Sequence, residues 1–173
     1  MSANLDIAIY NRLTGIETLT GAAAAAQAAL IAFLATDPDT AKPAVYNMNL
    51  NDAQGTDGSG NKIVLYPCLT FRQSAGAADR SMWNTGAIHE TAMYDVEVWS
   101  DKRTNLPVKQ ALENVDRLLD YRLGAVNETT NPLVITDGRV MVSQSVITLN
   151  SHYDRAIHAW AGTVRYAITM SRW

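Results

Sequence analysis

The chain has 173 residues, 47% of them hydrophobic, which is enough to bury a core without disulfides or structural metals, and we expect a single domain over residues 1–173. Lys and Arg number 14 against 17 Asp and Glu, which gives a net charge of -3. The chain therefore lacks the excess of basic residues that a dedicated nucleic-acid binder usually has. The one cysteine, Cys68, excludes an intrachain disulfide and a cysteine metal cluster.

The N-terminal part of the chain predicts two helices. Apolar residues over 5–13 indicate a short first helix with Asn4 as its N-cap. Ala22 to Leu34 predicts a second, because alanine has the highest helix propensity, and Asp37-Pro38 should end it. The start of the chain lacks the basic region of a signal peptide, and the alanine-rich stretch is too short for a bilayer. We therefore expect synthesis in the cytoplasm and no membrane association.

Strands and loops alternate through the next segment. Residues 44–50 and 63–72 predict strands, and Pro67 predicts that the second is an edge strand or contains a bulge. Residues 51–62 are rich in Gly, Asp, Ser and Asn and predict a flexible loop. A second polar loop, at about 73–86, contains Arg80, Met82 and Trp83.

The second half of the chain shows the clearest periodic patterns of apolar and polar residues. Thr91 to Ser100 predicts a strand with Tyr94, Val96 and Val98 on one face and Asp95 and Glu97 on the other. An amphipathic helix follows over 106–123, with Asn105 as its N-cap and Pro107 in its first turn. Strands over 139–149 and 156–172 end the chain. This order predicts an α+β fold: a mostly antiparallel sheet of about five strands with helices packed on one side.

Few residues suggest catalysis or metal binding. Gly55 to Lys62 resembles a phosphate loop, but Asn61 stands where lysine should follow the glycine, and a strand follows. The same stretch starts like a calcium loop but has Cys68 in place of the bidentate glutamate. The three histidines lack a metal-binding spacing. Asp95 and Glu97 could act as an acid/base pair, but the pattern favours a solvated or interface-facing strand surface. The sequence predicts no enzyme, no cofactor and no metal.

Several residues are instead candidates for an interface. Lys102 and Arg103 belong to a short charged turn, which is typical of a solvated surface, and they could instead pair with acidic groups of a neighbouring subunit. Trp83 and Trp173 are large aromatics in a polar loop and at the chain end, where they could anchor a partner or fold onto their own core. With Arg80, Met82, Asp95 and Glu97 they form the predicted interface set.

The order of elements resembles that of the tail terminator and tail-completion proteins of siphophages. The resemblance rests on Tyr66-Pro67-Cys68-Leu69-Thr70-Phe71, on Tyr94-Asp95-Val96-Glu97-Val98-Trp99-Ser100 leading into a helix, and on a final pair of long strands. An opening helix contains Ile9-Tyr10-Asn11-Arg12-Leu13. The alanine-rich Gly15 to Thr40 and the glycine loop at Asn51 to Lys62 depart from the family pattern.

The resemblance implies a structural protein of the virion, at the head-proximal end of the tail. It implies a homo-oligomeric ring, six subunits in the family, that caps the tail tube protein and contacts the head-completion (connector) protein. DNA would pass through the ring without specific binding. Two alternatives remain open: a head-completion stopper or minor tail protein, and, in a different class, a small-ligand binding module or enzyme with a pocket lined by Tyr94, Trp160 and Tyr166.

Overall fold

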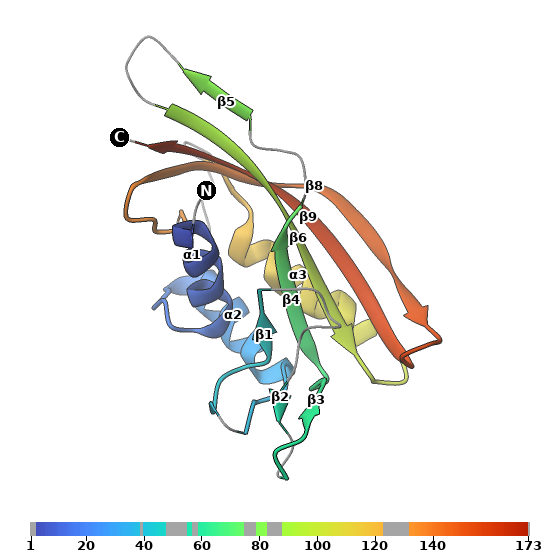
Figure 1. Ribbon diagram of the computed structural model, residues 1–173. Helices are drawn as coiled ribbons and strands as arrows, with labels where there is room; N and C mark the ends of the chain where they lie inside the picture. Colours follow the sequence, from blue (N-terminus) through green and yellow to red (C-terminus); the bar gives the residue numbers. More distant parts are fainter. Residues whose placement is uncertain are drawn as a thin grey trace.

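The computed structural model of this chain describes residues 3–38, 40–47, 55–56, 59–74, 79–82, 88–122 and 132–172. Within these ranges the chain forms three helices and nine strands. Figure 1 shows the helices gathered on one side of a long, twisted sheet, with β5 and the start of β6 extending beyond the helical layer.

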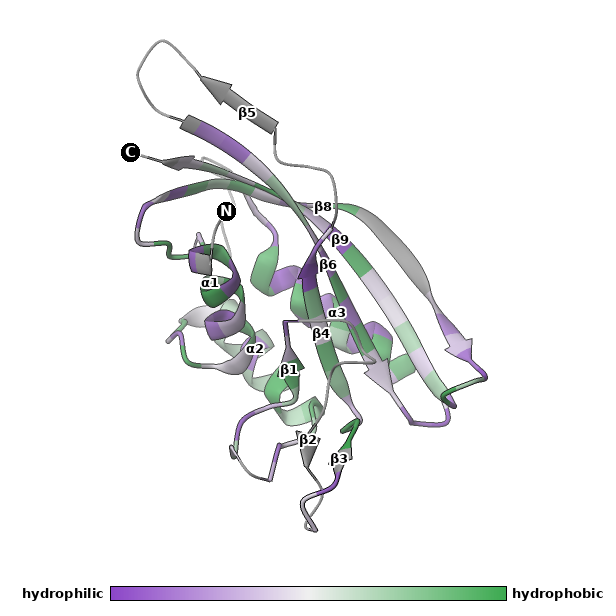
Figure 2. Ribbon diagram, viewed as in Figure 1, coloured by the Kyte–Doolittle hydropathy of each residue, from purple (hydrophilic) through white to green (hydrophobic). Residues whose placement is uncertain are grey.

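Periodic burial explains the three helices, α1 (Ala3–Thr14), α2 (Gly21–Phe33) and α3 (Leu106–Leu119). In α1, Leu5, Ile9 and Leu13 recur at four-residue spacing and are fully buried. In α2 the buried residues include Ala23 and Ala26, whose small side chains allow α2 to lie close against α3. Figure 2 shows hydrophobic and hydrophilic segments alternating along α1 and α3, as expected for helices with one face in the core.

The strands are β1 (Val45–Tyr46), β2 (Gly55–Thr56), β3 (Lys62–Ile63), β4 (Cys68–Gln73), β5 (Asp79–Met82), β6 (Ile88–Ser100), β7 (Tyr121–Arg122), β8 (Gly138–Asp154) and β9 (Ala159–Arg172). Seven of them form one sheet in the order β1-β4-β6-β9-β8-β7, and β5 also pairs with β6. All its pairs are antiparallel except β1 with β4. The predicted α+β class is confirmed, as is a mostly antiparallel sheet with helices on one side.

Side-chain alternation along β6 and β9 separates the two faces of the sheet. Tyr94, Val96 and Val98 are buried beneath the helices, opposite Tyr166, Val164 and Gly162 of β9. The other face is not covered by any helix of the described chain (Figure 1). Part of it carries a small second cluster around Cys68, which packs with Tyr66, Trp99 and Ile157.

The structure corrects several predicted strand and loop boundaries. The predicted loops contain short strands: β2 and β3 form a hairpin within 51–63, and β5 pairs with residues 88–91 of β6. Pro67 lies just before β4, outside its ladder, so β4 is neither an edge strand nor bulged there. The final hairpin turns at 155–158, and residues 48–50 of the first predicted strand lie outside the described residues.

Of the two predicted N-caps, Asn105 does stand at the N-cap position of α3, with Pro107 in the first turn, whereas Asn4 is wrong. Asn4 lies inside α1. Asn105 adopts a helical backbone and makes no side-chain capping bond; its amide instead donates to the Ser151 hydroxyl at 3.1 Å, because β8 passes beside it. The third helix ends at Leu119, earlier than predicted, since the next residues pair with β8 as β7.

A buried arginine joins α1 to the end of α3. Arg12 is fully buried and donates to both carboxylate oxygens of Glu17, at 2.9 and 2.5 Å. It also donates to the backbone oxygens of Leu118 (3.3 Å) and Pro132 (2.9 Å). The Gln27 amide donates to the backbone oxygen of Arg12 at 2.7 Å. This network fixes the segment before β8 against the helices, since a buried charge must be paired to be tolerated.

Among the described helices, none is long and apolar enough to cross a membrane.

Candidate interaction surfaces

The uncovered face of the sheet contains the two acidic residues that the sequence singled out. Asp95 and Glu97 share this face of β6, as predicted, and cross-strand partners lie on both sides. Arg72 of β4 stands opposite Asp95 on one side, and Arg165 of β9 stands opposite it on the other. Since facing side chains on one face of a sheet interact directly, these strands form a polar, charge-paired surface.

Asp95 is held in an ion pair with Arg165. Arg165 Nε and Nη2 donate to the two carboxylate oxygens at 2.5 and 3.0 Å. The hydrogen bond from Arg165 lowers the pKa of Asp95 below its ordinary value, partly opposed by burial and helped by the Ser74 hydroxyl. Only 9% of the Asp95 side chain is exposed, against 41% for Arg165. Asp95 is therefore not the solvent-facing carboxylate that the alternation suggested.

Glu97 is held more loosely. The Thr70 hydroxyl donates to its Oε2 at 3.4 Å, and Arg72 Nη2 lies 3.9 Å from its Oε1. Further along the strands the hydroxyls of Thr91 and Thr169 are 2.9 Å apart. Each carboxylate therefore lies near a basic group, Asp95 beside Arg165 and Glu97 beside Arg72. This arrangement is that of charge pairs on a sheet surface and not that of a coupled acid/base pair.

Lys102 and Arg103 lie at the far end of β6, where they border a hollow of about 370 Å³. Its other lining residues are Asp101, Tyr153, His158 and Trp160. The rings of Tyr153 and Trp160 meet edge to face with centroids 5.4 Å apart, and the Tyr153 hydroxyl is 3.3 Å from Nδ1 of His158. His158 stands in the turn before β9 with a φ of 53°, not on the strand as the sequence pattern indicated. The hollow combines two basic side chains and two aromatic rings with one carboxylate, and this excess of basic groups suits an acidic partner surface.

The remaining interface candidates are only partly placed. Arg80 and Met82 belong to β5, opposite Glu90 and Ile88 of β6. Trp83 and Trp173 lie outside the described residues. The role of these four residues stays a prediction.

The pocket expected for a ligand-binding module does not form from its three predicted residues. Tyr94 and Tyr166 are buried in the core, directly opposite one another on β6 and β9. Burial, with the nearby Asp116 carboxylate, raises the pKa of the Tyr166 phenol, so it stays protonated. Trp160 lies at the hollow beside Lys102 instead.

Cys68 is unsuited to nucleophilic chemistry. Its side chain is fully buried, and burial raises the pKa of the thiol to about 12. The nucleophilic form is the thiolate, which would be scarce at neutral pH. Among the described residues no group of three or more His, Cys, Asp or Glu side chains could hold a metal ion.

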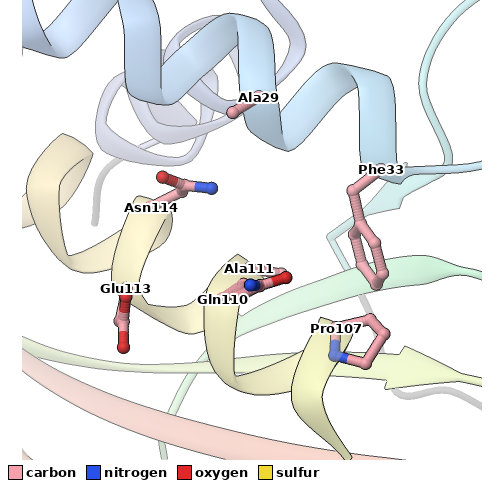
Figure 3. A pocket seen from close by; sticks show the side chains of 7 residues that line it. All are labelled: Ala29, Phe33, Pro107, Gln110, Ala111, Glu113 and Asn114. Atoms are coloured by element: carbon pink, nitrogen blue, oxygen red, sulfur yellow. The ribbon is translucent and has the colours of Figure 1, made fainter. Parts of the chain in front are cut away.

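A cleft of about 320 Å³ lies between the last turns of α2 and the first half of α3 (Figure 3). Ala29 and Phe33 border it from α2, and Pro107, Gln110 and Asn114 border it from α3. Figure 3 shows Phe33 pointing from α2 toward Pro107, while the Glu113 carboxylate points away from α2. These side chains provide apolar surface and amide groups. They do not bring an acid, a base and a nucleophile together, so the cleft does not resemble a catalytic site.

Comparison with known proteins finds a likeness in fold alone. Neither a protein-family profile nor a curated protein sequence matches this chain. Among solved structures, a chain of the virion of native gene transfer agent (GTA) particle has a similar fold, with a TM-score of 0.59 and 14% sequence identity. The match covers 99% of this chain and 99% of that chain. The two chains therefore share their architecture from end to end.

Proposed function

We propose that this chain is a virion structural protein that caps a phage tail tube as a ring and joins the tube to the head connector. The observation that carries the proposal is the end-to-end likeness in fold to a chain of a gene transfer agent virion. The sequence resemblance to the tail terminators of siphophages supports the more specific role.

The uncovered sheet face is compatible with this role. Because Asp95 pairs with Arg165, and Glu97 lies near Arg72, positive and negative charges are balanced across the strands. A surface of balanced charge lacks the accumulated positive potential that holds DNA by its phosphates. Such a face could border a water-filled passage through which DNA moves without specific binding.

Capping would act by surface complementarity. One face of the ring would match the exposed end of the tail tube, and the other face would present a different surface to the connector, so tube growth stops. A closed ring needs a heterologous contact, in which two different patches of neighbouring copies meet. β5 and the start of β6 extend beyond the helical layer, where they could reach a neighbour (Figure 1).

The test is to add purified protein to tail tubes assembled without it and to image the tubes by electron microscopy. We expect a ring at one end of each tube, no further tube growth, and the protein in virions at the neck. Arg80→Glu should weaken capping, whereas Lys42→Glu, at an exposed position near β1, should not. Protein that binds isolated head connectors but never tubes would be a stopper, and protein that binds neither would refute the proposal.

A further inference from the structure

Three exposed hydrophobic side chains gather in one groove beside α1. Ile7, Ile16 and Val134 are 55%, 54% and 72% exposed, and all three line a groove of about 420 Å³. Scattered exposed hydrophobic residues are ordinary on protein surfaces, but several in one concave site mark a place where another surface packs.

One carboxylate lies among the residues that line the groove, and it is already paired with Arg12. Glu17, the charged residue among those that line the groove, supplies this carboxylate. Its carboxylate accepts from Arg12 and keeps 19% of its side chain exposed. A carboxylate can accept about four hydrogen bonds, so Glu17 can accept from a further cation.

A complementary surface lies where α3 begins. Leu106, the first residue of α3, is 57% exposed. Lys102 and Arg103, both exposed, precede it by four and three residues. This corner, defined by Lys102, Arg103 and Leu106, is apolar and carries two cations beside the single carboxylate of Asp101. The groove is apolar, and the Glu17 carboxylate is among the groups that line it.

The corner and the groove lie at opposite ends of the helical layer. Arg12, the partner of Glu17, donates to the backbone oxygen of Leu118 near the end of α3, whereas Leu106 begins that helix. A helix of 14 residues is about 20 Å long. Figure 1 shows the end of α3 close to α1 and its start far from it. One copy cannot bring its own two patches together, but a head-to-tail pair of copies can.

We propose that Leu106 of one copy packs into the groove formed by Ile7, Ile16 and Val134 of the next copy, with Lys102 and Arg103 facing Glu17. The occupant is a second copy because one chain carries both halves of a contact that matches in hydrophobicity and in charge. The contact is heterologous, as ring closure requires. The inference rests on the proposed ring and identifies its seam.

Cysteine cross-linking tests the seam. The native Cys68 is fully buried, so introduced thiols should react first. Leu106→Cys and Val134→Cys are purified separately, mixed and oxidised mildly. We expect a cross-linked dimer in the mixture, at least about tenfold more than in either variant alone, and a ladder of larger species from a chain carrying both substitutions. Lys102→Glu with Arg103→Glu should reduce the yield about tenfold.

Ile63→Cys serves as the matched control, because Ile63 is an exposed hydrophobic residue on β3, outside both patches. Equal cross-linking of Leu106→Cys with the control, or of Leu106→Cys with itself, would overturn the proposed seam. So would the absence of a mixed dimer on particles that carry the protein. If the chain caps tubes without this cross-link, the seam is wrong and the function stands; if it cross-links but never binds tubes, the function is wrong and the seam stands.

Discussion

Tyr94 and Tyr166 face each other across β6 and β9, yet their hydroxyls bind different helices. Tyr94 donates to Asp6 of α1 at 2.5 Å, and Tyr166 donates to Asp116 of α3 at 3.1 Å. Two neighbouring residues of the sheet therefore orient two helices, and each hydroxyl reaches a carboxylate at the margin of the core. An apolar side chain of the same size would leave that carboxylate without its partner.

Removing the Tyr166 hydroxyl should destabilise the fold. Tyr166→Phe retains the packing and loses a hydrogen bond to a carboxylate, so we expect a loss of about 1–2 kcal/mol in the free energy of unfolding. Urea titration monitored by circular dichroism measures it. Tyr153→Phe is the control, because Tyr153 is 44% exposed and should change stability by less than about 0.5 kcal/mol. Equal effects of the two substitutions would contradict the assigned hydrogen bond.

Arg12 should be the most sensitive charged position. Arg12→Met removes the partner of Glu17 and leaves two backbone oxygens without their donor, so we expect a loss of about 3 kcal/mol. Thermal and urea unfolding both report it. Arg103→Met, at an exposed position, is the control and should leave subunit stability nearly unchanged. If Arg12→Met were as stable as the original chain, the buried network would not be needed for the fold.

Asp95 should contribute to stability above its unfolded-state pKa and lose that contribution in acid. Because Arg165 lowers the pKa of Asp95 in the folded state below the ordinary 3.8, the contribution is present above pH 3.8 and fades as pH falls through the lower folded value. Asp95→Asn should therefore weaken the protein at pH 7 and reduce the further loss between pH 4 and about pH 2. Unfolding curves across this range measure it. Adding Arg165→Met to Asp95→Asn should not alter the pH dependence further; an additional change would show that Arg165 acts through another group.

Gly162 should tolerate a side chain only if Leu112 and Val108 of α3 shift. A methyl group there would lie 2.6 Å from Leu112 Cδ1 and 2.9 Å from Val108 Cγ1. We expect Gly162→Ala to cost about 1–3 kcal/mol, because the buried side chains of Leu112 and Val108 must shift within a closely packed layer. In the Leu112→Ala background the same change should cost clearly less, since the nearest side chain is gone. A double-mutant cycle by urea unfolding tests this, and additive effects would place the clash elsewhere.

Local sequence pattern was most informative where one face of an element is buried. Alternation identified the strand at 91–100 and assigned Asp95 and Glu97 to one face, and the stripe of α3 follows its helical period. Boundaries were less predictable. The residues of β5 were predicted to be a loop because Asp79-Arg80-Ser81-Met82 shows no alternation of apolar and polar residues. They form a strand because they pair with the start of β6, on the same edge of β6 that β4 pairs with further along.

The sequence alone predicted the buried face of the clearest elements, since hydrophobic periodicity and propensity are properties of neighbouring residues. It did not predict that Arg12 is buried or that Ile7 is exposed. The sequence could not determine which side chains form ion pairs, because such pairs depend on the register between strands that are distant in the sequence. Asp95 meets Arg165 across 70 positions only through the alignment of β6 with β9. The groove beside α1 likewise needs Val134, which the Arg12 network brings against the helix. The tertiary structure, through the register of distant strands and the buried Arg12 network, therefore decided which side chains lie together on one surface.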